Sequence, residues 1–420
     1  MDNPAPTRLS ETMSPDTDIL IAGGGLTGPA LALALADGGL SVTLIDARPA
    51  NTRTKPAFDG RAYALALASR RLLTATGVWP VVADTSQPIL GIRITDGRAN
   101  SGPGRHSLCF DHAEIEEGPM GHMLEDRFLY RAYLKAMQDH PGITHLPGRA
   151  VCSQRVAGAG VSVRLDNRQT LSGAVLIGCD GRHSGVAERA GIGRTGWGYG
   201  QTSLVCAIEH ELPHRGVAHQ HFMPAGPLAI LPLPGNRVSI VWSERDRAAR
   251  DIQALDDGGY LDVLRPRFGD FLGNISVSGQ RFTYPLGLSL ANSFIAERVA
   301  LAGDAAHGVH PLAGQGLNLG LRDAGALAEV LICARRRGED IGAGQVLARY
   351  QRWRRWDTAT MAVATDGLNR LFSNDNGALR LARGLGLSAV NGLPRLRRAF
   401  IREAAGLTGD LPALMQGRQI

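Results

Sequence analysis

Cysteine and aromatic residues are scarce in this sequence, and their scarcity excludes several classes of protein. The five cysteines among 420 residues are scattered and form no Cys-x-x-Cys pair. This spacing argues against a disulfide scaffold and a cysteine metal site, and it favours a reducing compartment. Aromatic residues make up 5% of the chain, and no zinc-finger or helix-turn-helix signature is present, so we expect no nucleic-acid partner.

Long apolar stretches and several short catalytic motifs are missing as well. No apolar run reaches the roughly 18 residues of a membrane span, and the polar, proline-rich first residues lack the apolar segment of a secretory signal. We therefore expect a cytoplasmic protein. There is no P-loop, no Ser-His-Asp order and no internal repeat. His307 and His310 follow Asp304 in a loop without a further ligand, so no metal is expected.

The chain otherwise has an ordinary globular composition, 44% hydrophobic and 20% charged, and it is long enough for two or three packed units. Its 45 basic and 39 acidic side chains leave a net charge of +6 and a pI near 9.3. Such a balance suits an anionic ligand or surface, or solubility alone.

A dinucleotide fingerprint stands near the start of the chain. Residues 18–22 are predicted to form a buried strand, Gly23-x-Gly25-x-x-Gly28 follows, and an Ala- and Leu-rich helix leads to a second strand that ends at Asp46. Gly23 permits the tight turn, Gly25 lets a pyrophosphate approach, and Gly28 lets the helix pack on the sheet. An acid at 46 favours an unphosphorylated ribose, as in FAD or NAD.

Two further strands are predicted to end in an acid. Residues 174–178 run into Asp180-Gly181, and residues 299–302 run into Gly303-Asp304. The carboxyl ends of parallel strands meet at one edge of a sheet, so we expect three acids, including Asp46, to converge on one crevice. Three such sites suggest a large dinucleotide.

The loop after Asp304 is rich in glycine and leads into a helix predicted over residues 321–331. Gly314 and Gly316 allow an approach that a Cβ would block. Backbone N–H groups at the helix start can bind an anion or an electron-rich ring.

Residues 200–290 differ in character, with four predicted antiparallel strands at 203–210, 217–223, 228–233 and 237–243. We expect a substrate domain here, lying over the cofactor. Its apolar side chains Leu228, Ile230 and Leu233 are interpreted as core. Residues 80–120 are predicted to be irregular and to belong to a second layer.

Two arginines are possible cofactor contacts. Arg61 is predicted at the start of a helix that ends near Gly77, where the helix dipole disfavours a cation, so a cofactor contact and a surface position are weighed equally. Arg127 lies in a helix predicted over 122–137, and a helix-surface position is the alternative. After residue 331 the chain is helical and basic, which suits either a membrane-surface helix or packing on the body of the protein.

These motifs together resemble the group A flavoprotein monooxygenases typified by para-hydroxybenzoate hydroxylase, and within them the ubiquinone-biosynthesis hydroxylases. Further carriers of the resemblance are Asp59-Gly60-Arg61-Ala62, the segment from Pro311 to Asp323, and the segment from Thr365 to Phe372. The resemblance runs from about residue 16 to the C-terminus. It implies an α/β fold, in which a Rossmann-like FAD-binding domain carries an inserted antiparallel β-sheet substrate domain and C-terminal helices.

The implied domains are an FAD-binding domain in three parts, a substrate domain in two and a C-terminal helical region. Their expected bounds are 16–75, 120–190 and 285–335 for FAD binding, 76–119 and 191–284 for the substrate, and 336–420 for the helices.

The resemblance also implies the cofactor site. Asp46 would bind the adenosine ribose, Arg61 would contact the flavin, Asp304 would bind the ribityl chain, and residues 314–318 would lie along the isoalloxazine. The expected cofactor-binding residues are Gly23, Gly25, Leu26, Thr27, Gly28, Asp46, Ala47, Arg61, Arg127, Asp180, Gly181, Gly303, Asp304, Pro311, Gly314, Gln315, Gly316, Leu317 and Asn318.

The implied reaction is hydroxylation of the ring of a polyprenylated phenol through a flavin C4a-hydroperoxide formed with O₂. The cofactor carries the chemistry, so no side chain is expected to act as a catalyst. The arginine that the family has three residues after Ser184 is Ala187 here, so the electron donor is NAD(P)H or an external donor.

The sequence leaves several alternatives. The protein is then a hydroxylase of a soluble aromatic compound, a flavin-dependent reductase or halogenase, or a non-catalytic subunit of a quinone-biosynthesis complex. The Trp-x-Trp-x-Ile-Pro motif of halogenases is absent. Expected partners are the polyprenylated substrate, other quinone-biosynthesis proteins and the inner face of the membrane, whereas the oligomeric state is not predicted.

Overall fold

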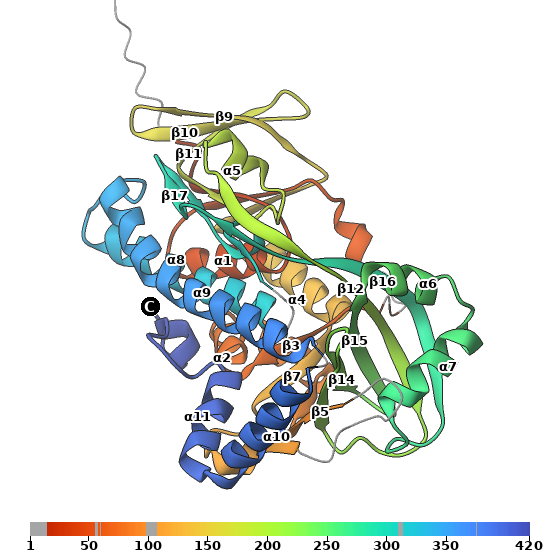
Figure 1. Cartoon of the computed structure of the whole chain (residues 1–420). Helices are drawn as coiled ribbons and strands as arrows, with labels where there is room; N and C mark the ends of the chain where they lie inside the picture. Colours follow the sequence, from red (N-terminus) through yellow and green to blue (C-terminus); the bar gives the residue numbers. More distant parts are fainter. Residues whose placement is uncertain (1–14, 55–57, 59, 98–106, 310–313, 375) are drawn as a thin grey trace, which may run out of the picture.

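The computed structural model describes residues 15–54, 58, 60–97, 107–309, 314–374 and 376–420. Asp59, His310 and Pro311, which the sequence analysis named, lie outside these residues. Figure 1 shows the chain as two large sheets joined by long strands, with the C-terminal helices along one side.

The first sheet holds the strands of the dinucleotide fingerprint. Its order is β17-β18-β11-β1-β2-β8, and the five strands from β18 to β8 run parallel. The strands of this sheet are β1 (Thr17–Ala22), β2 (Val42–Asp46), β8 (Ile143–Pro147), β9 (Val151–Ala157), β10 (Gly160–Leu165), β11 (Thr170–Gly178), β17 (Ile295–Ala296) and β18 (Val299–Leu301). β1 and β18 are buried continuous apolar runs, as expected for parallel strands covered on both faces.

Helices pack on this sheet through apolar faces. The helix after the glycine loop, α1 (Thr27–Asp37), lies against α8 (Gln315–Arg336), which comes almost 300 residues later. Their contact is close, because a Cβ on Gly38 would lie 2.2 Å from the Cδ1 of Ile332. The chain therefore brings its first and last cofactor motifs to the same end of the sheet.

The second sheet is mostly antiparallel, in the order β19-β16-β12-β15-β14-β13-β5-β6. Its strands are β5 (Gly91–Asp96), β6 (Ser107–Asp111), β12 (Arg194–His210), β13 (Val217–Phe222), β14 (Leu228–Leu233), β15 (Arg237–Arg245), β16 (Ile275–Ala291) and β19 (His307–Gly308). α6 (Asp246–Gln253) and α7 (Asp257–Phe268) cover one face, where Leu228 and Ile230 pack in a core with Trp242 and Tyr260. Leu228, Ile230 and Leu233 are all buried core residues, as interpreted from sequence.

Three expectations about local structure were wrong. Residues 80–120 are not irregular, because they include β4 (Gln87–Ile89), β5 and β6. The segment 122–137 begins as a strand, β7 (Gly121–Glu125), and becomes helical only at α4 (Asp126–Asp139). Arg61 precedes a strand, β3 (Ala62–Ala66), and the helix α2 (Leu67–Ala75) follows that strand.

The second and third of these errors have a common cause, a small third sheet in the order β3-β7-β4. β7 is its central strand and is buried throughout, so it shows no polar alternation that would distinguish it from a helix start. Several short elements connect the strands and helices before residue 310. They are α3 (Trp79–Val82), α5 (Gly185–Arg189), and the 3₁₀ turns η1 (Ala50–Arg53), η2 (Ala83–Thr85), η3 (His112–Glu114) and η4 (Gly303–Ala305).

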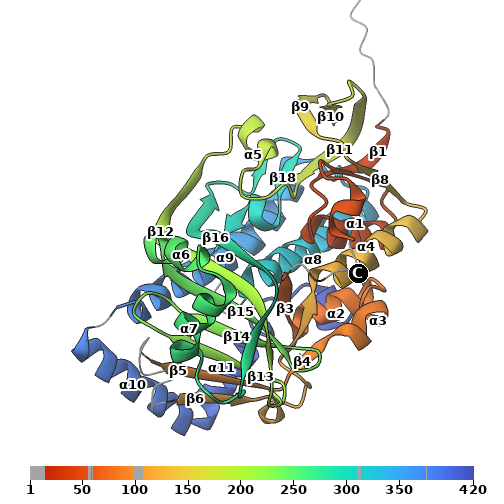
Figure 2. The same cartoon turned by 90° about the vertical axis from the view of Figure 1, so that its right-hand side faces the viewer.

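The C-terminal region is helical: α9 (Gly344–Phe372), α10 (Gly377–Gly392), α11 (Pro394–Ala404) and a final 3₁₀ turn, η6 (Ala413–Gln416). Figures 1 and 2 both place α10 and α11 beside β5 and β6. Arg383 of α10 pairs with Asp96 of β5 at 3.0 Å, and both side chains are buried. Within the described residues, no helix is long and apolar enough to cross a membrane.

The architecture confirms the expected fold class. The domain boundaries stay predictions, although β5 and β6 join the same sheet as the strands of residues 191–284.

Candidate active site

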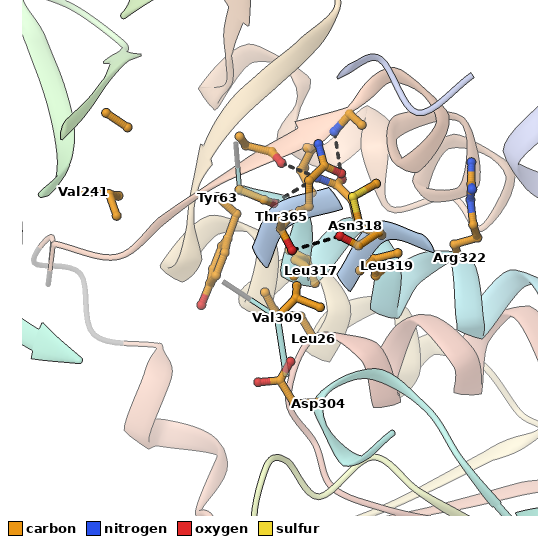
Figure 3. A pocket seen from close by; sticks show the side chains of 18 of the residues that line it. Leu26, Tyr63, Val241, Asp304, Val309, Leu317, Asn318, Leu319, Arg322 and Thr365 are labelled. Carbon is orange, nitrogen blue, oxygen red and sulfur yellow. Dashed lines mark hydrogen bonds between the residues drawn. The ribbon is translucent and has the colours of Figure 1, made fainter. Parts of the chain in front are cut away.

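A cavity of about 1840 Å³ begins at the carboxyl ends of β1, β2 and β11. It passes Asp304 and the start of α8, and it continues between the second sheet and α9, α10 and α11. Figure 3 shows Tyr63, Asp304, Leu317 and Asn318 around one part of this space.

The glycine loop after β1 closes one end of the cavity. A Cβ on Gly23 would lie 2.3 Å from the carbonyl oxygen of Cys179, and one on Gly28 would lie 2.0 Å from the carbonyl oxygen of Gly23. Gly25, in contrast, has nothing within 4 Å of the position of a Cβ. The loop is therefore packed tightly on the protein side and open on the cavity side, which suits backbone contact with a pyrophosphate.

Asp46 stands at the end of β2 beside this loop, and Ala47 also lines the cavity. The Asp46 carboxylate accepts the backbone N–H of Arg48 at 3.1 Å and faces the Tyr130 hydroxyl at 3.5 Å. A Cβ on Gly24 would lie 2.3 Å from Oδ2 of Asp46, so the loop needs glycine there to pass the acid. The position fits a carboxylate that binds ribose hydroxyls.

The other two acids differ in how their carboxylates are used. Asp180 accepts hydrogen bonds from the Ser184 hydroxyl and, at 3.0 Å, from the Val186 N–H, so it holds the start of α5 while lining the cavity with Gly181. The Asp304 side chain is 47% exposed and lies 3.3 Å from Nε of Arg182. Asp304 therefore offers acceptor oxygens to a ligand in the cavity.

A buried ion-pair network fixes the turn that carries Asp304. The Asp323 carboxylate of α8 accepts the Gly303 N–H at 2.9 Å, Nε2–H of His307, and Nε–H of Arg354 at 2.8 Å. The side chains of Asp323, His307 and Arg354 are fully buried. Burial raises the pKa of Asp323, but the charges and hydrogen bonds of His307 and Arg354 outweigh it, so the pKa lies below its usual value.

The start of α8 presents backbone N–H groups to the same space. Gly314 precedes the helix with φ +65°, no side chain caps the first turn, and Gly316 has nothing within 4 Å of a Cβ position. Asn318 fastens the helix to β3, because its amide donates to the Ala64 carbonyl and accepts from the Ala66 N–H, both at 2.9 Å. The uncapped N–H groups can hold the electron-rich edge of a ring.

Arg61 and Arg127, the two arginines singled out from sequence, have different surroundings. Arg61 lines the cavity and lies 3.7 Å from the buried carboxylate of Asp126. Arg127, at the start of α4, pairs at 2.7 Å with the buried Glu125 that ends β7, and it does not line the cavity.

Most of the residues expected to bind a cofactor line this one cavity. Gly28 and Gly303 instead pack behind it, since a Cβ on Gly303 would lie 2.8 Å from the Thr27 hydroxyl. Together with Arg127 they are the described members of the expected set that do not line it.

The sequence analysis missed several lining residues. Arg53 pairs with Asp126 in the interior, and Tyr63 of β3 points into the space (Figure 3). Burial, and after it the charge of Asp126, raises the pKa of Tyr63 far above its usual value, so its hydroxyl stays protonated. The alternation from Ala62 to Ala66 was a usable signal for Tyr63, whereas no signal marked Arg53.

The glycine loop, Asp46, Asp304 and the start of α8 thus fit the pyrophosphate, the two sugar chains and the ring of a flavin dinucleotide. A model of the FAD-binding domain family matches residues 16–364. The chain belongs to that family. Together with its similarity to ubiquinone hydroxylases, this membership identifies it as an FAD-dependent monooxygenase, which uses O₂.

The sequence of this protein aligns over almost its whole length with two relatives. It is 46% identical over 404 residues to ubiquinone hydroxylase UbiL of Rhodospirillum rubrum, covering 95% of this chain and 92% of that protein. It is 34% identical to 3-demethoxyubiquinol 3-hydroxylase of Escherichia coli, covering 93% of this chain and 99% of that protein. These similarities confirm the resemblance to the ubiquinone-biosynthesis hydroxylases.

Solved structures of two other monooxygenases share the fold. The p-nitrophenol 4-monooxygenase of Pseudomonas putida superposes with a TM-score of 0.77 at 19% identity, covering 94% of this chain and 98% of that chain. A probable FAD-dependent monooxygenase of Pseudomonas aeruginosa superposes with a TM-score of 0.72 at 23% identity, covering 88% of this chain and 99% of that chain.

Proposed function

We propose that this protein hydroxylates the aromatic ring of a polyprenylated phenol in ubiquinone biosynthesis. The observation that carries the proposal is the size and composition of the cavity. The cavity of about 1840 Å³ includes the cofactor end, and beyond it continues between the second sheet and the C-terminal helices. The extra space suits a ring with a long apolar tail.

The extension of the cavity, here called the apolar gallery, is bounded by two surfaces. The second sheet contributes the face opposite α6 and α7, and α9, α10 and α11 contribute the other wall. Representative residues of the gallery are Ile92, Ala229, Leu231, Met361, Leu368 and Phe372. Burying a prenyl chain against such side chains is favourable by about 25 cal/mol per Å² of apolar surface.

FAD, when bound, supplies the oxygen chemistry. The side chains of this protein bind and orient it, with Asp46 at the adenosine ribose, Asp304 at the ribityl chain and the first turn of α8 at the isoalloxazine. Gly25 and Gly314 keep the backbone close to the cofactor. The apolar walls exclude water from the ring, which protects the reaction from side reactions.

The electron donor in this proposal is NAD(P)H or an external donor. Ala187, which stands where the family has an arginine, is buried at the start of α5 and offers no charge to a nicotinamide dinucleotide. Arg182 and Arg189 line the cavity nearby and supply positive charge in its place.

The proposal also includes docking on the inner face of a membrane. Trp356 and Phe400 line the cavity and are 78% and 45% exposed, so they mark its mouth. Leu385 and Leu393 are exposed on the same helical region, with exposed arginines such as Arg395. Apolar side chains among cations fit an anionic bilayer, from which a polyprenylated substrate would enter.

A liposome assay tests the docking. Trp356→Asp is expected to weaken binding to vesicles containing anionic phospholipid by about tenfold, the scale of one lost apolar anchor of about 1.4 kcal/mol. The matched variant Val81→Asp changes an exposed apolar residue far from the mouth, on α3. Equal binding of both variants and of the unchanged protein would remove the membrane from the proposal.

Complementation tests the reaction itself. The chain is expressed in bacteria that lack each ring hydroxylase of the quinone pathway in turn, and the quinones are identified by mass. Restored quinone in one strain assigns the ring position, and restoration in several strains indicates broad regioselectivity. Failure in every strain by an FAD-loaded protein would favour a soluble aromatic substrate, or a non-catalytic role in a complex with other quinone-biosynthesis proteins.

A further inference from the structure

One polar side chain interrupts the apolar wall that the second sheet presents to the gallery. Gln220 of β13 pairs with Ile94 of β5 on one side and with Ala229 of β14 on the other. Beyond Ala229, the same row across the sheet continues with Val241 and Val205. All five residues line the cavity, so Gln220 is the one polar member of a row of apolar side chains.

The amide of Gln220 has no hydrogen-bond partner among the described residues of the chain, although it can both donate and accept. Its neighbours in the row carry only methyl and methylene groups. Ala229 is small, and it leaves room beside the amide for another molecule. The half-buried amide is open to the cavity, so a ligand that fills this part of the gallery must supply a hydrogen-bond partner or leave the amide unsatisfied.

A second unpartnered group lies on the same face of this sheet. Ser203 of β12 is two residues from Val205, so its side chain points to the same side of the strand. Ser203 is 2% exposed, lines the cavity, and its hydroxyl has no hydrogen-bond partner. The wall thus holds two polar groups without a partner among the described residues, the buried Ser203 hydroxyl and the Gln220 amide, which is open to the cavity.

Three other polar side chains near the gallery, those of Asn369, Gln201 and Arg383, already have partners within the protein. Asn369 donates to Gln201 at 3.1 Å, and Gln201 donates to the Ala225 carbonyl at 2.7 Å. Arg383 is paired with Asp96. These groups are therefore occupied by the protein, in contrast to Gln220.

We propose that Gln220 determines substrate specificity by hydrogen bonding an oxygen on the ring of the phenolic substrate. The inference rests on the proposed function, and it adds the group that recognises the head of the substrate. The side-chain carbonyl oxygen of Gln220 accepts the phenolic O–H, while Ile94, Ala229 and Val241 contact the ring and the first part of the tail. The orientation of the ring toward the cofactor follows from this one polar contact.

The test compares a short-chain prenylated phenol with its methyl ether, which lacks the O–H group. Binding is followed by the change in the visible spectrum of the FAD-loaded protein, and turnover by product formation. A site that hydrogen bonds a substrate hydroxyl discriminates against the analogue that lacks it. The unchanged protein is expected to bind the phenol about tenfold more tightly than the ether, the scale of one hydrogen bond.

Gln220→Leu is expected to abolish this preference while the FAD affinity stays unchanged. Gln280→Leu, at an exposed position of β16 that does not line the cavity, is the matched control and is expected to keep the preference. The inference is overturned when Gln220→Leu retains the preference, or when the unchanged protein shows none. Preferential binding without hydroxylation would instead refute the proposed function and leave the recognition by Gln220 standing.

Discussion

Replacing Asp323 by asparagine tests how the cofactor turn is held. The change keeps the shape of the side chain but removes its charge. It also replaces one carboxylate oxygen, which accepts hydrogen bonds in the unchanged protein, by an NH₂ group that can only donate. Asp323 is fully buried and accepts from Gly303, His307 and Arg354. Arg354 would remain buried with Asp357, 2.8 Å away, as its remaining carboxylate partner.

The structure sets the expected size of the effect. Breaking a buried ion pair by removing one charge costs about 3–5 kcal/mol, so the free energy of unfolding in urea, at a fixed excess of FAD, should fall by about that amount. Because the Gly303 N–H loses a carboxylate acceptor, FAD should also bind about tenfold more weakly, equivalent to about 1.4 kcal/mol. FAD affinity is measured by the quenching of flavin fluorescence.

Asp139→Asn provides the control. Asp139 pairs with Lys135 at 2.9 Å, but both side chains are largely exposed, so the loss should stay below about 1 kcal/mol. A loss of less than about 1 kcal/mol for Asp323→Asn as well would refute the reasoning. A large loss of stability with unchanged FAD affinity would show that the network stabilises the fold without setting the turn.

Further predictions concern pH, the glycine loop and α10. Burial, with smaller contributions from nearby cations, lowers the pKa of His221 to about 3, so the stability it contributes is present above its usual pKa of 6.5 and is lost as the pH falls below that value. On this account His221 alone should make unfolding at pH 5 cost about 2 kcal/mol less than at pH 7.5. His221→Gln should reduce the difference measured in urea titrations by about that amount, while His122 and His219, whose pKa values burial lowers to about 4, keep the remainder; an unchanged difference would contradict this. Gly28→Ala should weaken FAD binding at least about tenfold, by about 1.4 kcal/mol, since its Cβ would meet the Gly23 carbonyl at 2.0 Å; normal flavin content after purification would contradict this. Arg383→Met should leave the Asp96 carboxylate buried and unpaired, at a cost of about 3–5 kcal/mol, and should make α10 sensitive to limited proteolysis; protection equal to that of the unchanged protein would count against the pairing.

The sequence predicted the cofactor site best at positions where the backbone conformation requires a particular residue. Gly23, Gly28 and Gly314 are required by close approaches or a positive φ, and these constraints appear directly as residue identity at fixed spacing. Asp46 and Asp304 were also predictable, because strand ends in a parallel sheet share one edge.

Other parts depended on tertiary contacts that local sequence does not encode. β7 is central in a small sheet and buried throughout, so its pattern is compatible with a helix. Arg53 and Asp126 meet from positions 73 residues apart, and Gln220 becomes distinctive only through its neighbours Ile94 and Ala229 on other strands. Asp180, in turn, was expected to serve the ligand, but its carboxylate is largely engaged in starting α5.

The length of the paired strands β12 and β16 bears on how a substrate enters the gallery and how the product leaves it. Each is 17 residues long, and they pair with each other along nearly their whole length, from the end near the first sheet to the far side of the second (Figure 1). The pairing is interrupted by two register shifts but is otherwise continuous, so it resists a hinge motion between the two sheets. We therefore expect entry of a long substrate to depend on movement of the other wall of the gallery, formed by α9, α10 and α11.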